Sequence, residues 1–245
     1  MSGTTNLCGV GDYLQIPNYT DSASCNLWTK HIIGNRDKWK SKLDAYTYGN
    51  AWYLEIETGC LHSYHAEAEA SNKLVSALPA YLPTMIDTCQ FLAPKDNNGK
   101  AYPIRARTVN LGPYWSWSGL HIFEANEEVN GGAFHCDYEG LAPYPQKLFE
   151  EETRAYSAVL SVAAPESGGG LRVWPRRFLA NEEIPYMPDE EAVDLDYQPG
   201  TLTILDSFMG HQIMESEFKP DQLRITGVIH WLLLDDPYPH WEYWF

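Results

Sequence analysis

A histidine and an aspartate two residues apart are the first side chains in the sequence with the chemistry to hold a metal ion. His135 and Asp137 lie in GGAFHCDYEG, within a segment expected to form a strand, 133–138. Side chains alternate along a strand, so this spacing puts both on one face. Two other pairs share the spacing: His65 with Glu67 and His240 with Glu242. His65 lies in an expected helix, where residues two apart do not face each other, and no histidine follows His240.

His211 supplies a third ligand for the first pair. It lies in PGTLTILDSFMGHQI, where an expected strand ends near Asp206 and a short loop leads into the next strand. Two histidines and one carboxylate occupy one face of an octahedral ion and leave positions open for chemistry, which is the ligand set of non-haem Fe(II) oxygenases. We therefore expect His135, Asp137 and His211 to be metal ligands and catalytic residues.

Arg224 is the candidate for binding an organic anion near that metal. It begins the run RITGVIHW, and period two places Arg224, Thr226, Val228 and His230 on one face of a strand. A guanidinium binds a carboxylate through two parallel hydrogen bonds, so Arg224 with Thr226 could bind the distal carboxylate of a 2-oxo diacid. The next candidates, also on expected strands, are Arg105, Arg107 and Arg172.

These pieces together resemble the Fe(II)/2-oxoglutarate-dependent oxygenases. The matching pieces, in family order, are HCD (135–137), GGGLRVW (168–174), PGTLTILD (199–206), His211 and Arg224. The resemblance implies a double-stranded β-helix, also called a jelly roll or cupin-like fold, with Fe(II), 2-oxoglutarate and O2 as cofactor and co-substrates. It implies oxidation of an unactivated C–H bond with release of succinate and CO2.

The segments YGNAWYLEIETG (48–59) and LHIFEANEEVNGGAFHCDYEG (120–140) are similar to a subgroup of hydroxylases and radical halogenases that act on free amino acids and alkaloids. The halogenases have Gly or Ala where this chain has Asp137, and a carboxylate there fills the chloride position. The resemblance therefore implies a hydroxylase of a small molecule, with a free amino acid as the expected substrate.

Two other functions fit the same residues. A cupin-like metal dioxygenase or isomerase would use the metal without a keto acid and form no succinate. A jelly-roll binding module would use the histidines as structural residues and bind no metal.

Several neighbouring features have simpler explanations. We expect Gly168–Gly170 to form a turn and Cys136 to pack in the core. The cluster Tyr238, Trp241, Tyr243, Trp244 and Phe245 is expected to pack on the barrel, although it could also wall a substrate pocket. The acidic run 189–196 is expected to be a solvated loop, with a lid over the site as the alternative.

Periodicity predicts a mainly β chain with N-terminal helices. Apolar spacing indicates helix over 62–92, interrupted at Pro79 and Pro83, and a further helix over 145–153. The strands expected are 104–111, 119–125, 133–138, 155–163, 170–174, 201–205, 212–214 and 224–233. We expect one oxygenase domain, with a helical layer over 1–100 and the β-helix core over 101–245.

Composition excludes several partners. The 245 residues carry 17 Lys+Arg against 33 Asp+Glu, a formal net charge of −16, so the surface repels nucleic acid and anionic lipid. No apolar run is long enough to span a membrane, and no signal peptide is evident. Five cysteines without a CxxC pair indicate reduced thiols, and we expect a cytoplasmic protein. The sequence does not indicate an oligomeric state.

Overall fold

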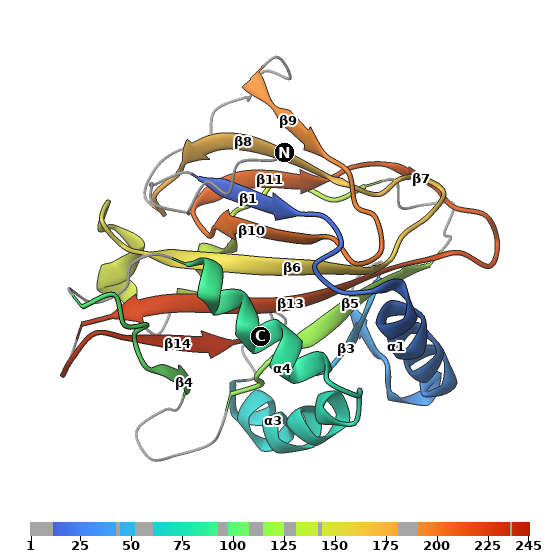
Figure 1. Ribbon diagram of the computed structural model, residues 1–245, viewed down its shortest axis with the longest axis horizontal. Coiled ribbons are helices and arrows are strands. Elements are labelled where there is room, and N and C mark those ends of the chain that lie inside the picture. Colours follow the sequence, from blue (N-terminus) through green and yellow to red (C-terminus); the bar gives the residue numbers. More distant parts are fainter. Residues whose placement is uncertain are drawn as a thin grey trace.

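A large antiparallel sheet forms the frame of the protein. The computed structural model describes residues 12–42, 45–51, 61–92, 98–107, 115–124, 131–141, 144–180, 191–235 and 237–245. The strand order is β1-β10-β6-β13-β5-β3-β2, and β14 pairs with β13 on one side and, in parallel, with β4 (Figure 1). The strands are β1 (Tyr13–Ile16), β2 (Lys40–Lys42), β3 (Ala45–Tyr48), β4 (Ile104–Ala106), β5 (Gly119–Glu124), β6 (Ala155–Ala163), β10 (Leu202–Asp206), β13 (Leu223–Leu234) and β14 (His240–Trp244).

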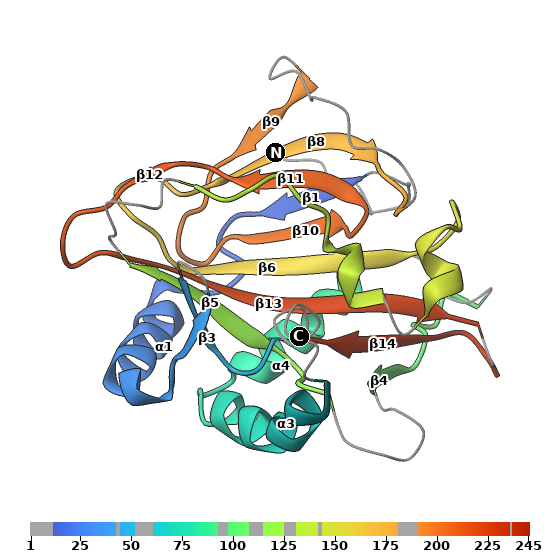
Figure 2. The same ribbon diagram turned by 180° about the vertical axis from the view of Figure 1, so that it is seen from behind.

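Smaller sheets lie across from part of the large one. One has the order β11-β8-β9 and consists of β8 (Leu171–Arg177), β9 (Val193–Leu195) and β11 (Met209–Ile213); the other pairs β7 (Ser167–Gly168) with β12 (Ser216–Glu217). The chain passes from the large sheet to the smaller one through the short turn between β10 and β11 (Figure 2). Strands that alternate between facing sheets make a double-stranded β-helix, so the expected fold class is confirmed.

Helices cover the outer face of the large sheet. They are α1 (Ser22–Gly34), α3 (Leu61–Ser76) and α4 (Tyr81–Ile86), with the 3-10 turns η1 (Arg36–Lys38) and η2 (Asp87–Phe91). The Asp21 side chain caps α1 by accepting a hydrogen bond from Ser24 N at 2.8 Å. Pro79 lies between α3 and α4, as expected, whereas Pro83 lies in the first turn of α4, where its missing N–H has no helical partner to lose.

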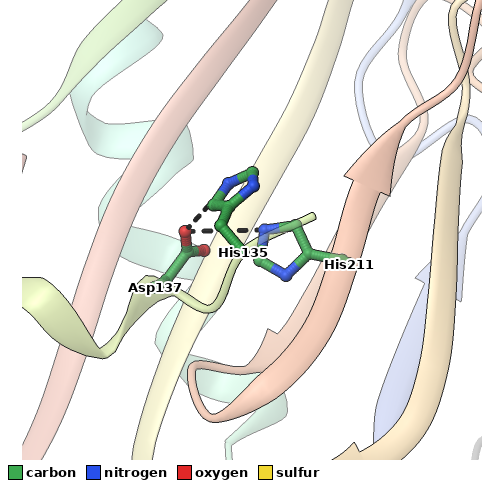
Figure 3. Close-up of side chains that lie close together, drawn as sticks. All are labelled: His135, Asp137 and His211. Carbon is green, nitrogen blue, oxygen red and sulfur yellow. Dashed lines mark ion pairs between the residues drawn. The ribbon is translucent and has the colours of Figure 1, made fainter. Parts of the chain in front are cut away.

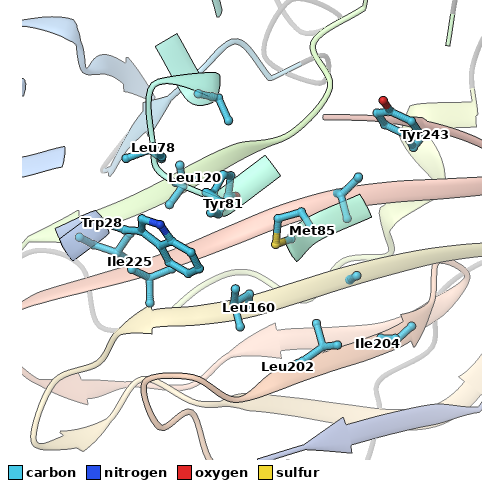
Figure 4. Close-up of a cluster of buried hydrophobic side chains, with 14 of the residues drawn as sticks. Trp28, Leu78, Tyr81, Met85, Leu120, Leu160, Leu202, Ile204, Ile225 and Tyr243 are labelled. Atoms are coloured by element: carbon cyan, nitrogen blue, oxygen red, sulfur yellow. The ribbon is translucent and has the colours of Figure 1, made fainter. Parts of the chain in front are cut away.

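Burial of the apolar helix faces creates the main core. The helices contribute Trp28, Tyr81 and Met85 to this core, and the connection between α3 and α4 contributes Leu78. The sheet contributes Leu120, Leu160, Leu202, Ile204 and Ile225 (Figure 4). These residues alternate along their strands with polar or charged ones, such as Ser161, Thr203, Arg224 and Thr226, which are buried on the opposite, inner face. The barrel interior therefore contains buried polar and charged side chains beside its apolar ones. None of the helices in the described part of the chain has the length and hydrophobicity that crossing a bilayer requires.

Two expected elements are wrong. Residues 133–138 do not form a strand: His135 makes a single bridge with His211, and the 3-10 turn η3 (Asp137–Leu141) begins at Asp137. The helix expected over 145–153 is only the 3-10 turn η4 (Pro145–Leu148). Residues 108–111 and 125, expected at the ends of strands, lie outside the described residues, as do residues 52–59 of the subgroup match, Cys8 and Cys60.

Candidate metal centre

His135, Asp137 and His211 come together at the open end of the barrel interior. Their potential ligand atoms all lie within 4.8 Å of one another. The Asp137 Oδ1 atom is 3.7 Å from His135 Nε2 and 3.5 Å from His211 Nε2 (Figure 3). His135 and Asp137 lie close together as expected, but the turn into η3 brings them together, and not strand alternation. His211 lies within β11, whose start at Met209 is earlier than expected.

Backbone carbonyls set the orientation of both imidazoles. His135 Nδ1 lies 2.9 Å from the carbonyl oxygen of Ala133, and His211 Nδ1 lies 2.9 Å from that of Met209. A carbonyl only accepts, so each Nδ1 carries the proton and donates it. Each Nε2 is then left with a lone pair and faces the Asp137 carboxylate. Metal-binding histidines typically have this tautomer, with one ring N–H donated to a carbonyl or carboxylate and the other ring nitrogen free for the metal.

Charge interactions keep the carboxylate of the triad ionised. Burial raises the pKa of Asp137, but His211, His230 and His135 together outweigh burial and hold that pKa well below its usual range. Burial lowers the pKa of His211, but Asp137 and the Met209 carbonyl together outweigh burial, and the net shift of that pKa is upward. A dication would take the place of the proton that His211 otherwise binds beside Asp137.

His230 is a buried histidine on the inner face of β13. The period-two pattern predicted that His230 shares this face with Arg224, but it predicted no role for His230. Its Nδ1 lies 3.0 Å from Ser157 Oγ, which is 3.2 Å from Ser207 Oγ. The ring stacks on Trp244 with an interplanar angle of 28°. Burial lowers the pKa of His230, so it is neutral beside the triad.

Arg224 is buried on the same face of β13, at the opposite end from His230. Its Nε donates a 2.7 Å hydrogen bond to the carbonyl oxygen of Gly169, and its guanidinium lies between the rings of Phe123 and Tyr197 at 5.2 and 5.3 Å. No carboxylate of the described part of the chain pairs with it. Burial lowers its pKa to about 10. A buried cation without a counterion is costly, so Arg224 has the character of an anion-binding residue.

Two buried hydroxyl groups near the inner face that carries Arg224 lack hydrogen-bond partners within the described residues. Ser161 lies directly across from Thr226 on β6, and its buried Oγ makes no hydrogen bond within the described residues. The buried Tyr197 hydroxyl lies beside Thr203 without a hydrogen bond of normal geometry. The sequence did not single out either residue, because Ser and Tyr alternate through many strands of this chain. Buried orphan hydroxyls next to an unpaired cation fit a carboxylate ligand.

The other candidates from the sequence occupy different settings. Arg105 is exposed over the ring of Tyr238 at 4.8 Å, and Arg172 forms a two-point ion pair with Asp194 at 2.7 and 2.9 Å. Arg107 is buried among the rings of Trp115, Tyr144 and Trp244. Neither His65 nor His240 belongs to a group of three potential ligands within the described residues.

Several simpler expectations are confirmed. Gly168 and Gly169 have φ of 75° and 70°, as a tight turn requires, and Cys136 is buried with Trp174 and Phe178. In the aromatic cluster at 238–245, all but the exposed Tyr238 are buried in the apolar clusters of the protein. Part of the acidic run forms strand β9, and residues 189–190 lie outside the described part, so the lid stays a prediction.

Comparison with solved structures supports the fold. The chain is similar to a structure described as a novel N-substituted L-amino acid dioxygenase from Burkholderia ambifaria AMMD, with a TM-score of 0.57 and 14% identity over 96% of this chain and 86% of the other. A structure of that dioxygenase in complex with alpha-ketoglutarate gives a TM-score of 0.54 and 13% identity over the same shares. No protein-family model and no curated protein matches the sequence. At this level of identity, the likeness shows that the chain shares the fold of these oxygenases.

Proposed function

We propose that this protein is an Fe(II)- and 2-oxoglutarate-dependent dioxygenase that hydroxylates a C–H bond of a small molecule. The observation that carries this proposal is the triad of His135, Asp137 and His211, in which both Nδ1 atoms are bonded to carbonyls and both Nε2 atoms face one carboxylate. The reaction consumes 2-oxoglutarate and O2 and yields succinate, CO2 and the hydroxylated substrate.

The donor set fits ferrous iron. Imidazole and carboxylate suit Fe(II), and three ligands on one face leave positions for co-substrates. When bound, iron supplies the activation of O2. The chain's own residues hold the metal, keep Asp137 anionic and hold each imidazole in the tautomer that presents Nε2.

Arg224 fits the distal carboxylate of 2-oxoglutarate. Its guanidinium is buried and has no carboxylate partner in the described chain, and the hydroxyls of Ser161 and Tyr197 are unsatisfied nearby. Thr226, buried two residues further along β13, shares this inner face. We assign Arg224 and Thr226 as co-substrate-binding residues.

A free amino acid is the substrate class that we favour. The fold neighbour from Burkholderia ambifaria is a dioxygenase of N-substituted L-amino acids, and the sequence resembles hydroxylases and halogenases of free amino acids. Asp137 favours hydroxylation over halogenation, because a carboxylate occupies the position that chloride would need. We further propose a single oxygenase domain that acts in the cytoplasm, in keeping with the free thiols of Cys25, Cys89 and Cys136.

Anaerobic reconstitution tests the proposal. Purified protein is titrated with Fe(II) and then with 2-oxoglutarate, and the visible metal-to-ligand charge-transfer absorption is followed. Succinate is next measured under air with a panel of free amino acids. Metal binding without the absorption band or succinate would favour a cupin-like enzyme that needs no keto acid. Absence of metal binding would favour a binding module with structural histidines.

A further inference from the structure

A buried ion pair lies behind the metal centre, at the turn that joins the two sheets. Arg177 Nε, at the end of β8, is 3.2 Å from Asp206 Oδ2, at the end of β10, and the side chains are 8% and 4% exposed. Arg177 also donates hydrogen bonds to the carbonyl oxygens of Glu151 and Thr153. Asp206 accepts a 2.9 Å hydrogen bond from Phe208 N through its other oxygen. The pair therefore ties two chain segments, the end of β8 and residues 151–153, to the turn at 206–209.

A β-bulge gives Arg177 this reach. Met209 pairs with Arg177, whereas the next residue, Gly210, pairs with Trp174, so two residues of β8 are left over. One of them is Pro175, which has no N–H to donate to a ladder. Bulges of this kind redirect side chains near functional sites. Here the bulge places the guanidinium over the Phe208 ring at 4.3 Å.

The turn at 206–209 contacts both His211 and the segment that carries Asp137. The carbonyl of Met209, its last residue, fixes the His211 ring through Nδ1 at 2.9 Å. The carbonyl of Phe208 accepts hydrogen bonds from Cys136 Sγ and from Phe178 N. The Phe208 ring packs on Tyr138 at 5.7 Å. Cys136 and Tyr138 flank Asp137, so a shift of this turn would displace His211 and Asp137 relative to each other.

Stability alone does not account for such a pair. Replacing a buried ion pair by apolar residues of similar size is often neutral or stabilising, because desolvation cancels most of the attraction. The pair adds specific hydrogen bonds among three segments, the end of β8, residues 151–153 and the turn at 206–209, which precedes His211.

We propose that Arg177 and Asp206 are positioning residues, which hold the 206–209 turn so that His211 and Asp137 meet in metal-binding geometry. This inference rests on the proposed function for the identity of the metal. It assigns no contact between the pair and the metal. Its consequence is that loss of the pair weakens metal binding while every ligand stays in place.

The test compares metal affinity between two double variants. Arg177→Met/Asp206→Asn removes both charges together, so no buried charge is left uncompensated. The matched control is Arg172→Met/Asp194→Asn, which removes the half-exposed ion pair between β8 and β9 in the same small sheet. Far-UV circular dichroism and Tm report folding, and anaerobic calorimetry with Fe(II) reports affinity. Visible absorption of bound Co(II) reports ligand geometry.

We expect the Arg177/Asp206 variant to bind Fe(II) about 10- to 100-fold more weakly than wild type, with an altered Co(II) spectrum. This range is typical when residues that orient the metal ligands are replaced. The control variant keeps wild-type affinity. Wild-type affinity in the folded Arg177/Asp206 variant, or equal losses in both variants, would overturn the proposal. If that variant does not fold, Asp206→Asn alone decides the matter, because it keeps the bond from Phe208 N and the same shape. A wild-type Fe(II) affinity in the Asp206→Asn variant would also overturn the proposal.

A metal-free measurement separates this inference from the proposed function. Long-range ¹H–¹⁵N NMR spectra report which ring nitrogen of His211 carries the proton. At a pH where the His211 ring is neutral, wild type should show one tautomer, with the proton on Nδ1, and the Arg177/Asp206 variant a mixture. If wild-type protein binds no Fe(II), the proposed function fails, and the tautomer comparison still decides whether the pair positions His211. An unchanged single tautomer in the variant would refute the positioning role.

Discussion

The main-chain N–H of His135 lies 2.9 Å from the carbonyl oxygen of His211, and the N–H of His211 lies 2.9 Å from the carbonyl oxygen of His135. The two histidines of the candidate metal site therefore form a reciprocal bridge, although they are far apart in sequence. This bridge docks the 131–136 segment on the edge of β11, the strand that carries His211. The two imidazoles are placed together by backbone pairing, before any metal contributes.

Removal of His211 should abolish metal binding. His211→Ala leaves two ligands of three, and a hydrated, weakly held ion results. We expect loss of stoichiometric Fe(II) in anaerobic calorimetry and loss of succinate formation. His240→Ala is the matched control: His240 has its Nδ1 at a carbonyl and its Nε2 3.5 Å from Glu242, but no third potential ligand lies with them among the described residues. Wild-type iron stoichiometry and turnover in His211→Ala would show that the ligand assignment is wrong.

Removal of Arg224 should separate co-substrate binding from metal binding. A buried arginine–carboxylate pair broken on one side typically costs about 3–5 kcal/mol, so Arg224→Ala should raise the KM for 2-oxoglutarate by two orders of magnitude or more. Fe(II) affinity should stay near wild type. Arg172→Ala removes a partly exposed arginine already paired with Asp194 and should leave the KM unchanged. An unchanged KM in Arg224→Ala would transfer the role to another residue.

Acid should weaken metal binding. The pKa of His211 in the metal-free protein lies above its usual value of 6.5: burial lowers it, but Asp137 and the Met209 carbonyl together raise it by more. Protons and metal compete for Nε2, so affinity is full above the raised pKa and falls as pH drops through it. We expect Kd to increase about tenfold per pH unit below that pKa, for one competing proton. Calorimetry between pH 6 and 8 checks this slope, and a flat profile would contradict it. In metal-free Asp137→Asn, NMR titration should show a lower His211 pKa.

The reaction outcome should be hydroxylation even at high chloride. Asp137 is anionic and faces both Nε2 atoms, so it blocks and electrostatically disfavours a second anion on that side. Once a substrate has been found, mass spectrometry of the products formed in concentrated NaCl should show added oxygen and no chlorine isotope pattern. Asp137→Gly is the comparison, because it opens that position to chloride. A chlorinated product from wild type would refute the hydroxylase assignment and leave the iron site intact.

Close contact between the helical layer and the sheet should make Gly227 irreplaceable. A Cβ at Gly227 would lie 2.5 Å from the Tyr81 hydroxyl oxygen, and Tyr81 is fully buried and bonded to the carbonyl of Gly119 at 2.9 Å. Gly227→Ala should lower the free energy of unfolding by about 1–3 kcal/mol, the usual range for overpacking. Gly34→Ala has nothing within 4 Å and should change it by less than about 0.5 kcal/mol. Urea denaturation measures both, and equal stability of the two variants would contradict this account.

The sequence predicted which residues lie together better than it predicted their local structure. Residue type and order singled out His135, Asp137 and His211, which the structure brings within 4.8 Å of one another, and Arg224, which is buried. Periodicity placed Arg224 and Thr226 correctly, because β13 is a long strand with one face toward the helices and the other toward the interior. The strand at 133–138 failed because its pairing is a single non-local bridge, which local propensity does not report.

Sequence patterns did not predict the contacts between strands that are far apart along the chain. Ser161 and Tyr197 carry no motif, and only the structure shows that Ser161 lies across from Thr226 and that the Tyr197 ring lies against Arg224. The Arg177–Asp206 pair depends on a bulge that shifts the register by two residues of β8, and no spacing rule indicates where such a bulge will fall.

The three candidate ligands differ in solvent exposure: the side chain of His135 is 46% exposed, that of Asp137 18% and that of His211 6%. A metal ion bound by them would be accessible to solvent on the side of His135 and shielded from solvent on the side of His211. Chelators such as EDTA would then attack from the His135 side, and dissociation would start with His135 while His211 still held the ion. The metal could exchange in the folded protein, without global unfolding. The lifetime of the loaded enzyme in a chelating medium would thus depend on the hold of the His135 segment, and not on the stability of the core.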